Sequence, residues 1–182
     1  MRDAARRIYE QVLVLRCQAG DDGAFTELVG LYSGRIGYFV RRMLADAASA
    51  DDVLQETWLA AFRGLGRLRS PAALPVWLYR IARDKACHEL RRRRQWVELA
   101  DDAAAPDDPA AGEPPLAPEQ AAAIHRGLER LAPPHREVLV LRFLEDMTYE
   151  DIAEVTGCPV GTVRSRIHYA RQALRREMED TR

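Results

Sequence analysis

The segment from residue 98 to residue 119 constrains the fold of this chain more than any other part of the sequence. It reads ELADDAAAPDDPAAGEPPLAPE, with seven acidic residues, five prolines and no basic or aromatic residue. Such a composition cannot bury enough apolar surface to offset the entropy lost on ordering. We therefore expect an acidic, Pro/Ala-rich linker over 98–118, with one folded domain before it (1–97) and a second after it (119–182).

The charge of the chain follows the same division. The whole sequence carries 27 Lys and Arg against 28 Asp and Glu, a formal net charge of −1. Residues 1–97 hold 17 basic and 11 acidic groups, whereas residues 120–182 hold ten of each. A basic domain beside an acidic linker suggests contact with a polyanion.

Helical periodicity, without a convincing strand, predicts an all-α fold for both domains. In the first domain we expect one helix over 24–44. A second starts near Ser49, where Ser49-x-x-Asp52 fits a capping box. A third runs from Pro75, which suits a first helical turn, to about Gln95. The expected core side chains of the last two helices are Leu54, Trp58, Ala61 and Leu65, then Trp77, Leu78, Ile81 and Ala82.

The second domain has its own helical signals. Apolar spacing predicts a helix over 121–131, a break at Pro133-Pro134 and a helix over 138–144. Thr148-x-x-Asp151 is a capping box that opens a short helix through Val155. Gly157 predicts a tight turn, and a last helix follows over 160–179.

A short capped helix, a glycine turn and a longer basic helix together predict a helix-turn-helix, whose second helix can enter the DNA major groove. Residues 160–176 hold five arginines and no acid. Arginine can bond guanine in pairs, while Ser, Thr and Gln can bond bases or phosphates. The alternative is a solvated basic face on a helical bundle.

Several stretches resemble the extracytoplasmic-function (ECF) sigma factors of bacterial RNA polymerase. TYEDIAEVTGCPVGTVRSRIHYARQALRRE is similar to the promoter-reading C-terminal domain of that family, and LAPPHREVLVLRFLEDM to its lead-in. DDVLQETWLAAFR resembles the helix that binds core polymerase, PVWLYRIARDKACHELRRRR the promoter-melting helix, and QAGDDGAFTELVGLY the N-terminal segment. The matches cover nearly all of 11–179 in the family's order. The resemblance implies a sigma region 2-like domain and a sigma region 4-like helix-turn-helix domain.

The resemblance also implies roles for individual residues. One polar face would dock on the clamp helices of the largest polymerase subunit; its members are Asp52, Gln55, Glu56 and Leu59. The −10 element would be read and melted by cations and aromatics that capture an extruded base and hold a single strand. These candidates are Arg67, Arg69, Trp77, Tyr79, Arg80, Arg83, Lys85 and the run Arg91 to Arg94. The −35 element would be contacted by Thr162, Arg164, Ser165, Arg166, His168 and Arg171.

Plainer interpretations stay open for several of these features. The face at 52–59 resembles an ordinary solvated helix face. Trp77 can be a core residue, and Arg166 can hold a backbone phosphate. The linker is either a disordered spacer or, as the family implies, an acidic imitation of nucleic acid that threads through polymerase channels.

Other function classes find little support. We find no P-loop, HExxH, GxSxG or plausible catalytic triad, so we expect no enzyme activity and no cofactor. Cys17, Cys87 and Cys158 form no CxxC pair, so neither a disulfide framework nor a metal site follows; a redox switch is a weak third hypothesis. No apolar run reaches the ~20 residues of a membrane helix, and no secretory signal is seen, so we expect a cytoplasmic protein without membrane insertion.

Two hypotheses therefore remain. The leading one is a sigma factor that joins core polymerase at its clamp helices and flap, recognises promoter DNA and is controlled by an anti-sigma factor. The alternative is a conventional helix-turn-helix regulator that binds DNA alone. Three features discriminate between them: the polar face at 52–59, the basic helix over 75–94 and the acidic linker. A sigma factor is expected to have all three, whereas a stand-alone regulator has no use for them.

Overall fold

The computed structural model describes residues 2–44, 46–97 and 125–179, and the regular structure within these ranges is entirely helical. The N-terminal half consists of α1 (Arg2–Gln18), α2 (Asp22–Met43), α3 (Ala47–Gly64), two 3₁₀ turns (Leu65–Arg67 and Pro71–Ala73) and α4 (Leu74–Val97). The C-terminal half contains a helical stretch over 125–130, α6 (Pro133–Leu139), a π-helix (Val140–Leu144), α7 (Tyr149–Thr156) and α8 (Val160–Glu179). The predicted linker at 98–118 and the first residues of the helix predicted over 121–131 lie outside the described residues.

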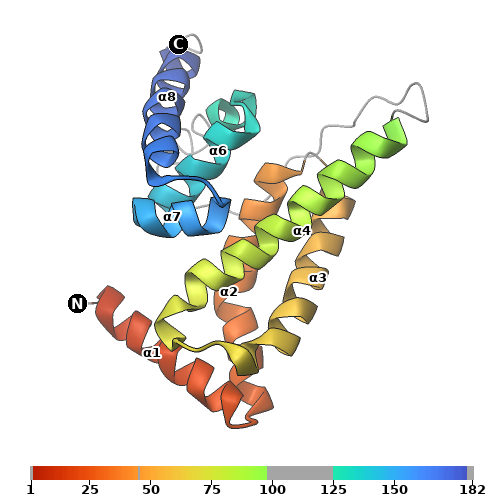
Figure 1. Ribbon diagram of the computed structural model, residues 1–182, viewed down its shortest axis with the longest axis vertical. Coiled ribbons are helices and arrows are strands. Elements are labelled where there is room, and N and C mark those ends of the chain that lie inside the picture. The colour runs from red at the N-terminus through yellow and green to blue at the C-terminus, as the bar shows by residue number, and fades with distance from the viewer. Residues whose placement is uncertain (1, 45, 98–124, 180–182) are drawn as a thin grey trace.

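Helices α2, α3 and α4 form the core of the N-terminal half, and α1 crosses its lower end (Figure 1). The helix predicted over 24–44 is confirmed as α2, in which Leu28, Tyr32, Ile36 and Phe39 are fully buried. The sequence analysis did not identify α1. Its buried residues Leu13 and Val14, with Cys17 packed beside them, have the spacing of a helix face that could have revealed it.

The start of α3 differs from the prediction. Its N-cap is Asp46, whose carboxylate accepts a hydrogen bond from the backbone N–H of Ser49, so the predicted capping box at Ser49 and Asp52 is wrong. An aspartate placed three residues before a free amide caps a helix as well as a serine does. The N-cap therefore lies three residues before the predicted one, and Ser49 is buried inside the first turn.

The buried side of α3 is also rotated from the predicted stripe. Val53, Thr57 and Ala61 face the core, whereas Leu54 and Trp58 are only partly buried beside it. Thr57 fits in the core because its hydroxyl donates to the backbone carbonyl of Val53 at 2.7 Å. A hydroxyl satisfied within its own helix can be buried at little cost.

The lead-in to the helix-turn-helix starts earlier than expected and ends in an unusual geometry. Pro133 and Pro134 begin α6 instead of breaking the chain before Val138. Proline suits a first helical turn because the amides there have no helical partner. The following residues, Val140–Leu144, form a π-helix, and Asp146 then takes a positive φ of 53°.

The helix-turn-helix agrees with its predicted signals. Thr148 and Asp151 form a reciprocal capping box at the start of α7. Gly157 ends α7 in the left-handed region, with φ of 64°, and α8 begins at Val160. The helix predicted over 160–179 is confirmed as α8, and Val163, Ile167 and Ala170 bury one of its sides.

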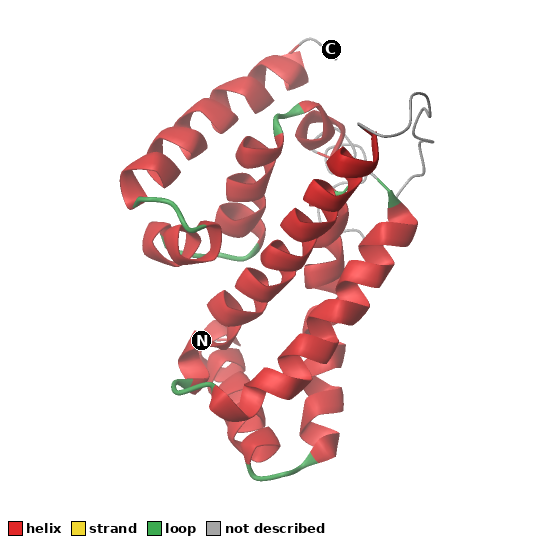
Figure 2. Cartoon of the chain, turned by 45° about the vertical axis from the view of Figure 1, so that its right-hand side comes forward, coloured by secondary structure: helices red, strands yellow, loops and turns green. Residues whose placement is uncertain are grey.

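The two halves pack against one another. Helix α7 lies against α4 and α6 lies against α2, while α3 runs alongside α4 (Figures 1 and 2). Two ion pairs cross the boundary with buried carboxylates: Arg83 Nε to Glu137 Oε1 at 2.6 Å, and Arg35 Nη2 to Glu145 Oε2 at 2.5 Å.

Gly157 and Gly161 offer a matched test of the turn. A Cβ at either position would meet no atom within 4 Å, but only Gly157 has a positive φ. We expect Gly157→Ala to lower the free energy of unfolding by about 1–2 kcal/mol, the cost of a left-handed conformation. Gly161→Ala should raise it slightly, because alanine favours helix. Urea unfolding measures both; equal effects would contradict the turn geometry.

A pH dependence of stability follows from Glu137 and Glu145. Burial raises the pKa of both carboxyls, against the opposing effect of Arg83 and Arg35. A glutamate in the unfolded chain has a pKa of about 4.3. Because the folded-state pKa is higher, protonation of these groups stabilises the folded protein. This contribution to the free energy of unfolding is fully present below about pH 4.3 and is lost as the pH rises through the raised pKa. Relative to Glu137→Gln, the wild-type free energy of unfolding should therefore increase as the pH falls from neutrality. A pH-independent difference in urea titrations would contradict this.

Candidate functional site

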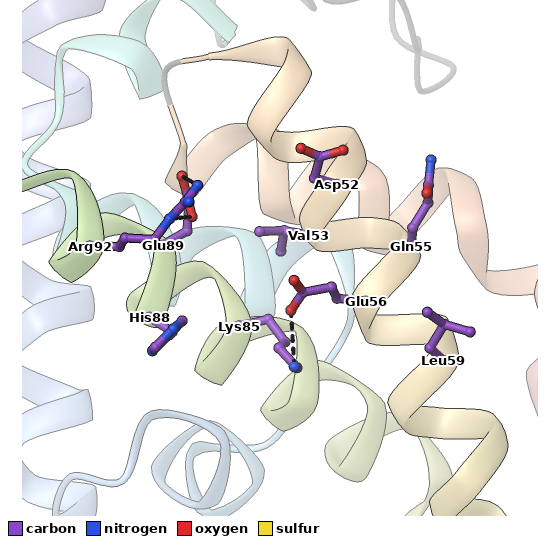
Figure 3. A pocket seen from close by; sticks show the side chains of 9 residues that line it. All are labelled: Asp52, Val53, Gln55, Glu56, Leu59, Lys85, His88, Glu89 and Arg92. Atoms are coloured by element: carbon purple, nitrogen blue, oxygen red, sulfur yellow. Dashed lines mark hydrogen bonds and ion pairs between the residues drawn. The ribbon is translucent and has the colours of Figure 1, made fainter. Parts of the chain in front are cut away.

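The first candidate site is a groove between α3 and α4. Four of its residues are those predicted to dock on polymerase: Asp52, Gln55, Glu56 and Leu59, all exposed on α3 (Figure 3). Their neighbours across the groove come from α4 and are Lys85, His88, Glu89 and Arg92. The structure thus brings the predicted face together as one surface.

Charged pairs organise this groove. Lys85 Nζ donates to Glu56 Oε2 at 3.0 Å, and Arg92 donates to both carboxylate oxygens of Glu89 at 2.8 and 2.9 Å. The groove has a volume of about 370 Å³. A small-molecule site of that size is normally lined by apolar side chains around a few polar groups. This lining of mostly charged and polar side chains better suits the polar side chains of a protein partner.

Two large apolar side chains project beside the groove. Leu59 and Phe62 are 55% and 59% exposed on α3. Phe62 is held in place by an edge-to-face contact with Phe25, at 5.1 Å between ring centroids. Exposed apolar groups next to polar ones are typical of protein interfaces, whose buried centres are apolar and whose rims are polar. Phe62 was not predicted as a site residue.

The residues predicted to contact the −10 element are not all on one surface. Arg67 and Arg69 are exposed between α3 and α4. Trp77 is partly buried and packs over Gly64, where an added Cβ would lie 2.9 Å from its ring. Tyr79 is fully buried and in edge-to-face contact with Phe39, so its prediction as a base-stacking residue is wrong. It belongs to the core because its position on α4 faces α2.

The cations of α4 separate into two groups. Arg80 and Arg83 face the C-terminal half, where Arg80 Nη1 lies 3.3 Å from Glu154 and Arg83 bonds Glu137. Arg91 is exposed. Lys85 lies instead in the groove with Glu56, away from Arg80 and Arg83. The side chains of Arg93 and Arg94 lie outside the described residues.

The second candidate site is the exposed face of α8. Arg164, Ser165, His168 and Arg171 are all exposed, and Thr162 is half-buried beside them. Ser165 Oγ donates to the backbone carbonyl of Thr162 at 3.0 Å, and His168 contacts Gln172 at 3.1 Å. This is the side of the second helix that a helix-turn-helix presents to the major groove.

Arg166 departs from this face. Its side chain is half-buried and turns towards the turn before α8, where Nη1 lies 3.6 Å from Cys158 Sγ. It also interacts electrostatically with Glu137. Arg166 is therefore placed apart from Arg164 and Arg171.

The three cysteines are free and partly buried. Burial raises the pKa of the Cys17 and Cys87 thiols, which lowers the fraction of the reactive thiolate at neutral pH. Within the described residues no cluster of His, Cys, Asp and Glu is arranged to hold a metal ion. Over the same residues no helix combines the length and apolarity needed to cross a bilayer.

Comparison with known proteins decides the family. Residues 28–96 match the family Sigma-70 region 2, and residues 121–174 match Sigma-70, region 4. The RNA polymerase sigma-H factor of Pseudomonas aeruginosa is 39% identical, over 93% of this chain and 94% of that protein. The ECF RNA polymerase sigma-E factor of Escherichia coli K12 is 35% identical over the same shares. The chain belongs to the ECF sigma factors.

As a sigma factor it is a non-enzymatic protein that directs transcription initiation. The groove between α3 and α4 lies within its region 2 match, and α7 with most of α8 lies within its region 4 match. The predicted domain boundaries at 97 and 119 fall outside both matches and stay a prediction.

Solved structures share the fold of this sigma factor. The sigma factor RpoE of Bartonella quintana, in complex with the anti-sigma factor NepR, gives a TM-score of 0.75 at 23% identity and covers 87% of this chain and 98% of that one. CnrH, in complex with the cytosolic domain of CnrY, gives a TM-score of 0.67 at 25% identity. The match covers 94% of this chain and 98% of that one.

Proposed function

We propose that the α3–α4 groove is the surface by which this sigma factor binds core RNA polymerase. The observation that carries the proposal is the exposed juxtaposition of Asp52, Gln55 and Glu56 with Leu59. The ion pair from Lys85 to Glu56 holds one of these carboxylates in place on α3. A fixed polar face with an apolar neighbour favours docking on a helical partner such as the clamp helices, with the flap contacted by the C-terminal half.

We propose that promoter DNA is bound by two further surfaces. Arg67, Arg69, Trp77, Arg80, Arg83 and Arg91 would contact the −10 element, and Thr162, Arg164, Ser165, His168 and Arg171 the −35 element. Arg166, turned away from the latter group, would hold a backbone phosphate. Lys85 is assigned to the polymerase-binding groove instead of the −10 surface, because it bonds Glu56 there.

An anti-sigma factor would silence the protein by covering the groove. Two structural neighbours were solved with anti-sigma or cytosolic partner domains, which supports a partner of this class. We further propose that the protein acts in the cytoplasm with polymerase, and that its 98–118 segment is an acidic linker between two domains. A stand-alone helix-turn-helix regulator would leave the α3–α4 groove without a use.

The groove assignment is tested by binding of fluorescently labelled protein to purified core polymerase. Gln55→Ala with Glu56→Ala should weaken the affinity by about tenfold or more, as expected for central interface residues. Asp22→Ala, an exposed change at the start of α2 outside the groove, is the control and should bind as the wild type. Unchanged binding of the groove variant would show that Gln55 and Glu56 form an ordinary solvated face.

The DNA assignment is tested by transcription with core polymerase on a library of randomised promoters. Arg164→Ala should lower the base preference at one position of the upstream motif by about tenfold, because a contact to a base carries sequence information. Arg166→Ala should lower the yield from all promoters alike, as loss of a phosphate contact does. An upstream motif unaltered by Arg164→Ala would refute the assignment of α8.

A further inference from the structure

Helix α1 lies against the loop between α3 and α4, although the two segments are far apart in the sequence (Figure 1). The last residue of α1, Gln18, donates from Nε2 to the backbone carbonyls of Leu65 at 3.1 Å and of Leu68 at 2.9 Å. These carbonyls belong to the first residue of the 3₁₀ turn Leu65–Arg67 and to the residue that follows the turn. Because the amide of glutamine has two N–H donors, a single side chain can bond both carbonyls and bridge the turn.

The end of α1 is anchored before it reaches this turn. Arg16 Nη2 lies 2.7 Å from Asp21 Oδ2, and Arg16 Nη1 lies 3.2 Å from Glu27 Oε1. Asp21 is also the N-cap of α2, so these pairs tie the end of α1 to the start of α2. On the other side of α1, Leu13 and Val14 are fully buried in the core. The last residue of α1 therefore starts from a defined position when it bonds the turn.

The bridged turn presents two arginines. Leu68 has an extended backbone, with φ of −68° and ψ of 110°, and its side chain packs on the core. Side chains on either side of an extended residue point the opposite way, so Arg67 and Arg69, which are both exposed, project away from the core. The two hydrogen bonds from Gln18 lie on either side of Arg67 and directly before Arg69. They therefore restrain the backbone that directs both arginines.

We propose that Gln18 is a positioning residue for recognition of the −10 element: it holds the turn so that Arg67 and Arg69 meet the promoter in one orientation. Gln18 acts through these arginines and does not contact DNA itself. A recognition group gains affinity and specificity when neighbouring hydrogen bonds hold it in its bound geometry. The inference rests on the proposed role of Arg67 and Arg69, whereas the restraint on the turn does not. Helix α1 lies outside the match to Sigma-70 region 2 at 28–96, so that match alone does not indicate this role.

Trypsin digestion of the folded full-length protein tests the restraint. Gln18→Met keeps the length and the helix propensity of the side chain but removes both donors. Cleavage after Arg67 and Arg69 should become severalfold faster, because a protease cuts a folded segment when it opens locally.

The control is Gln11→Met, the same change about two turns earlier on α1. The Gln11 side chain makes no hydrogen bond to any residue that the structure describes, so its variant should be cut at the wild-type rate. Equal cleavage of Gln18→Met and Gln11→Met overturns the proposal.

Transcription from the randomised promoter library tests the consequence for recognition. Gln18→Met should lower the base preference of the downstream motif severalfold, while the upstream motif and the affinity for core polymerase equal those of Gln11→Met. A general structural defect would weaken both motifs alike and would overturn the proposal.

A second variant, Arg67→Ala with Arg69→Ala, separates this inference from the proposed function. If that variant alters the downstream motif and Gln18→Met does not, the positioning role of Gln18 is wrong and the −10 assignment stands. If neither variant alters the motif, the assignment of the loop to the −10 element is wrong, and the positioning role fails with it.

Discussion

The packing of α4 is the constraint on which the rest of this structure depends. Leu78, Ala82 and Ala86 bury one side of the helix in the N-terminal core, and Tyr79 extends that core to α2. Because this side of α4 is fixed in the core, the directions in which its other side chains point are also fixed. Lys85, His88 and Arg92 point into the groove beside α3, and Arg80 and Arg83 point towards the C-terminal half. One helix therefore contributes to the groove proposed to bind polymerase, the surface proposed to bind −10 DNA and the contact between the halves.

Charge pairing decides which polar groups are available on these surfaces. Lys85 in the groove fixes Glu56 while leaving it exposed, whereas the buried Glu137 holds Arg83 at the contact between the halves. An exposed pair such as Lys85–Glu56 contributes little to stability, and its main effect is to hold a side chain in position. A pair with a buried carboxylate, such as Arg83–Glu137, makes the arrangement of the two halves specific, because each charge accepts few other partners.

The sequence predicted the elements whose signals are local. The Thr148–Asp151 capping box, the glycine turn at 157 and the extent of α8 depend on residues a few positions apart, and each agrees with the structure. The members of the face at 52–59 lie together on one exposed surface, because helical spacing alone brings them to one side of α3; their role in docking stays a prediction. Competing local signals explain the error at α3, where both Asp46 and Ser49 are good caps and only the structure shows which one is used.

The features missed from the sequence depend on contacts between distant segments. Tyr79 and Lys85 lie among cations in the sequence, but packing of α4 buries the first and pairs the second with Glu56 on α3. Nothing in the local pattern around Glu137 or Glu145 indicates partners on α4 and α2, more than 50 positions away in the chain. The family resemblance gave roles to exposed residues and was silent on these contacts.

The most direct test of the central claim is site-specific photo-crosslinking within a promoter complex. A photoreactive amino acid at position 55 should crosslink to the largest polymerase subunit, and one at position 164 should crosslink to duplex DNA upstream of the start site. Crosslinks from position 55 to DNA, or from neither position to these partners, would contradict the assignment of the α3–α4 groove to polymerase and of α8 to the promoter.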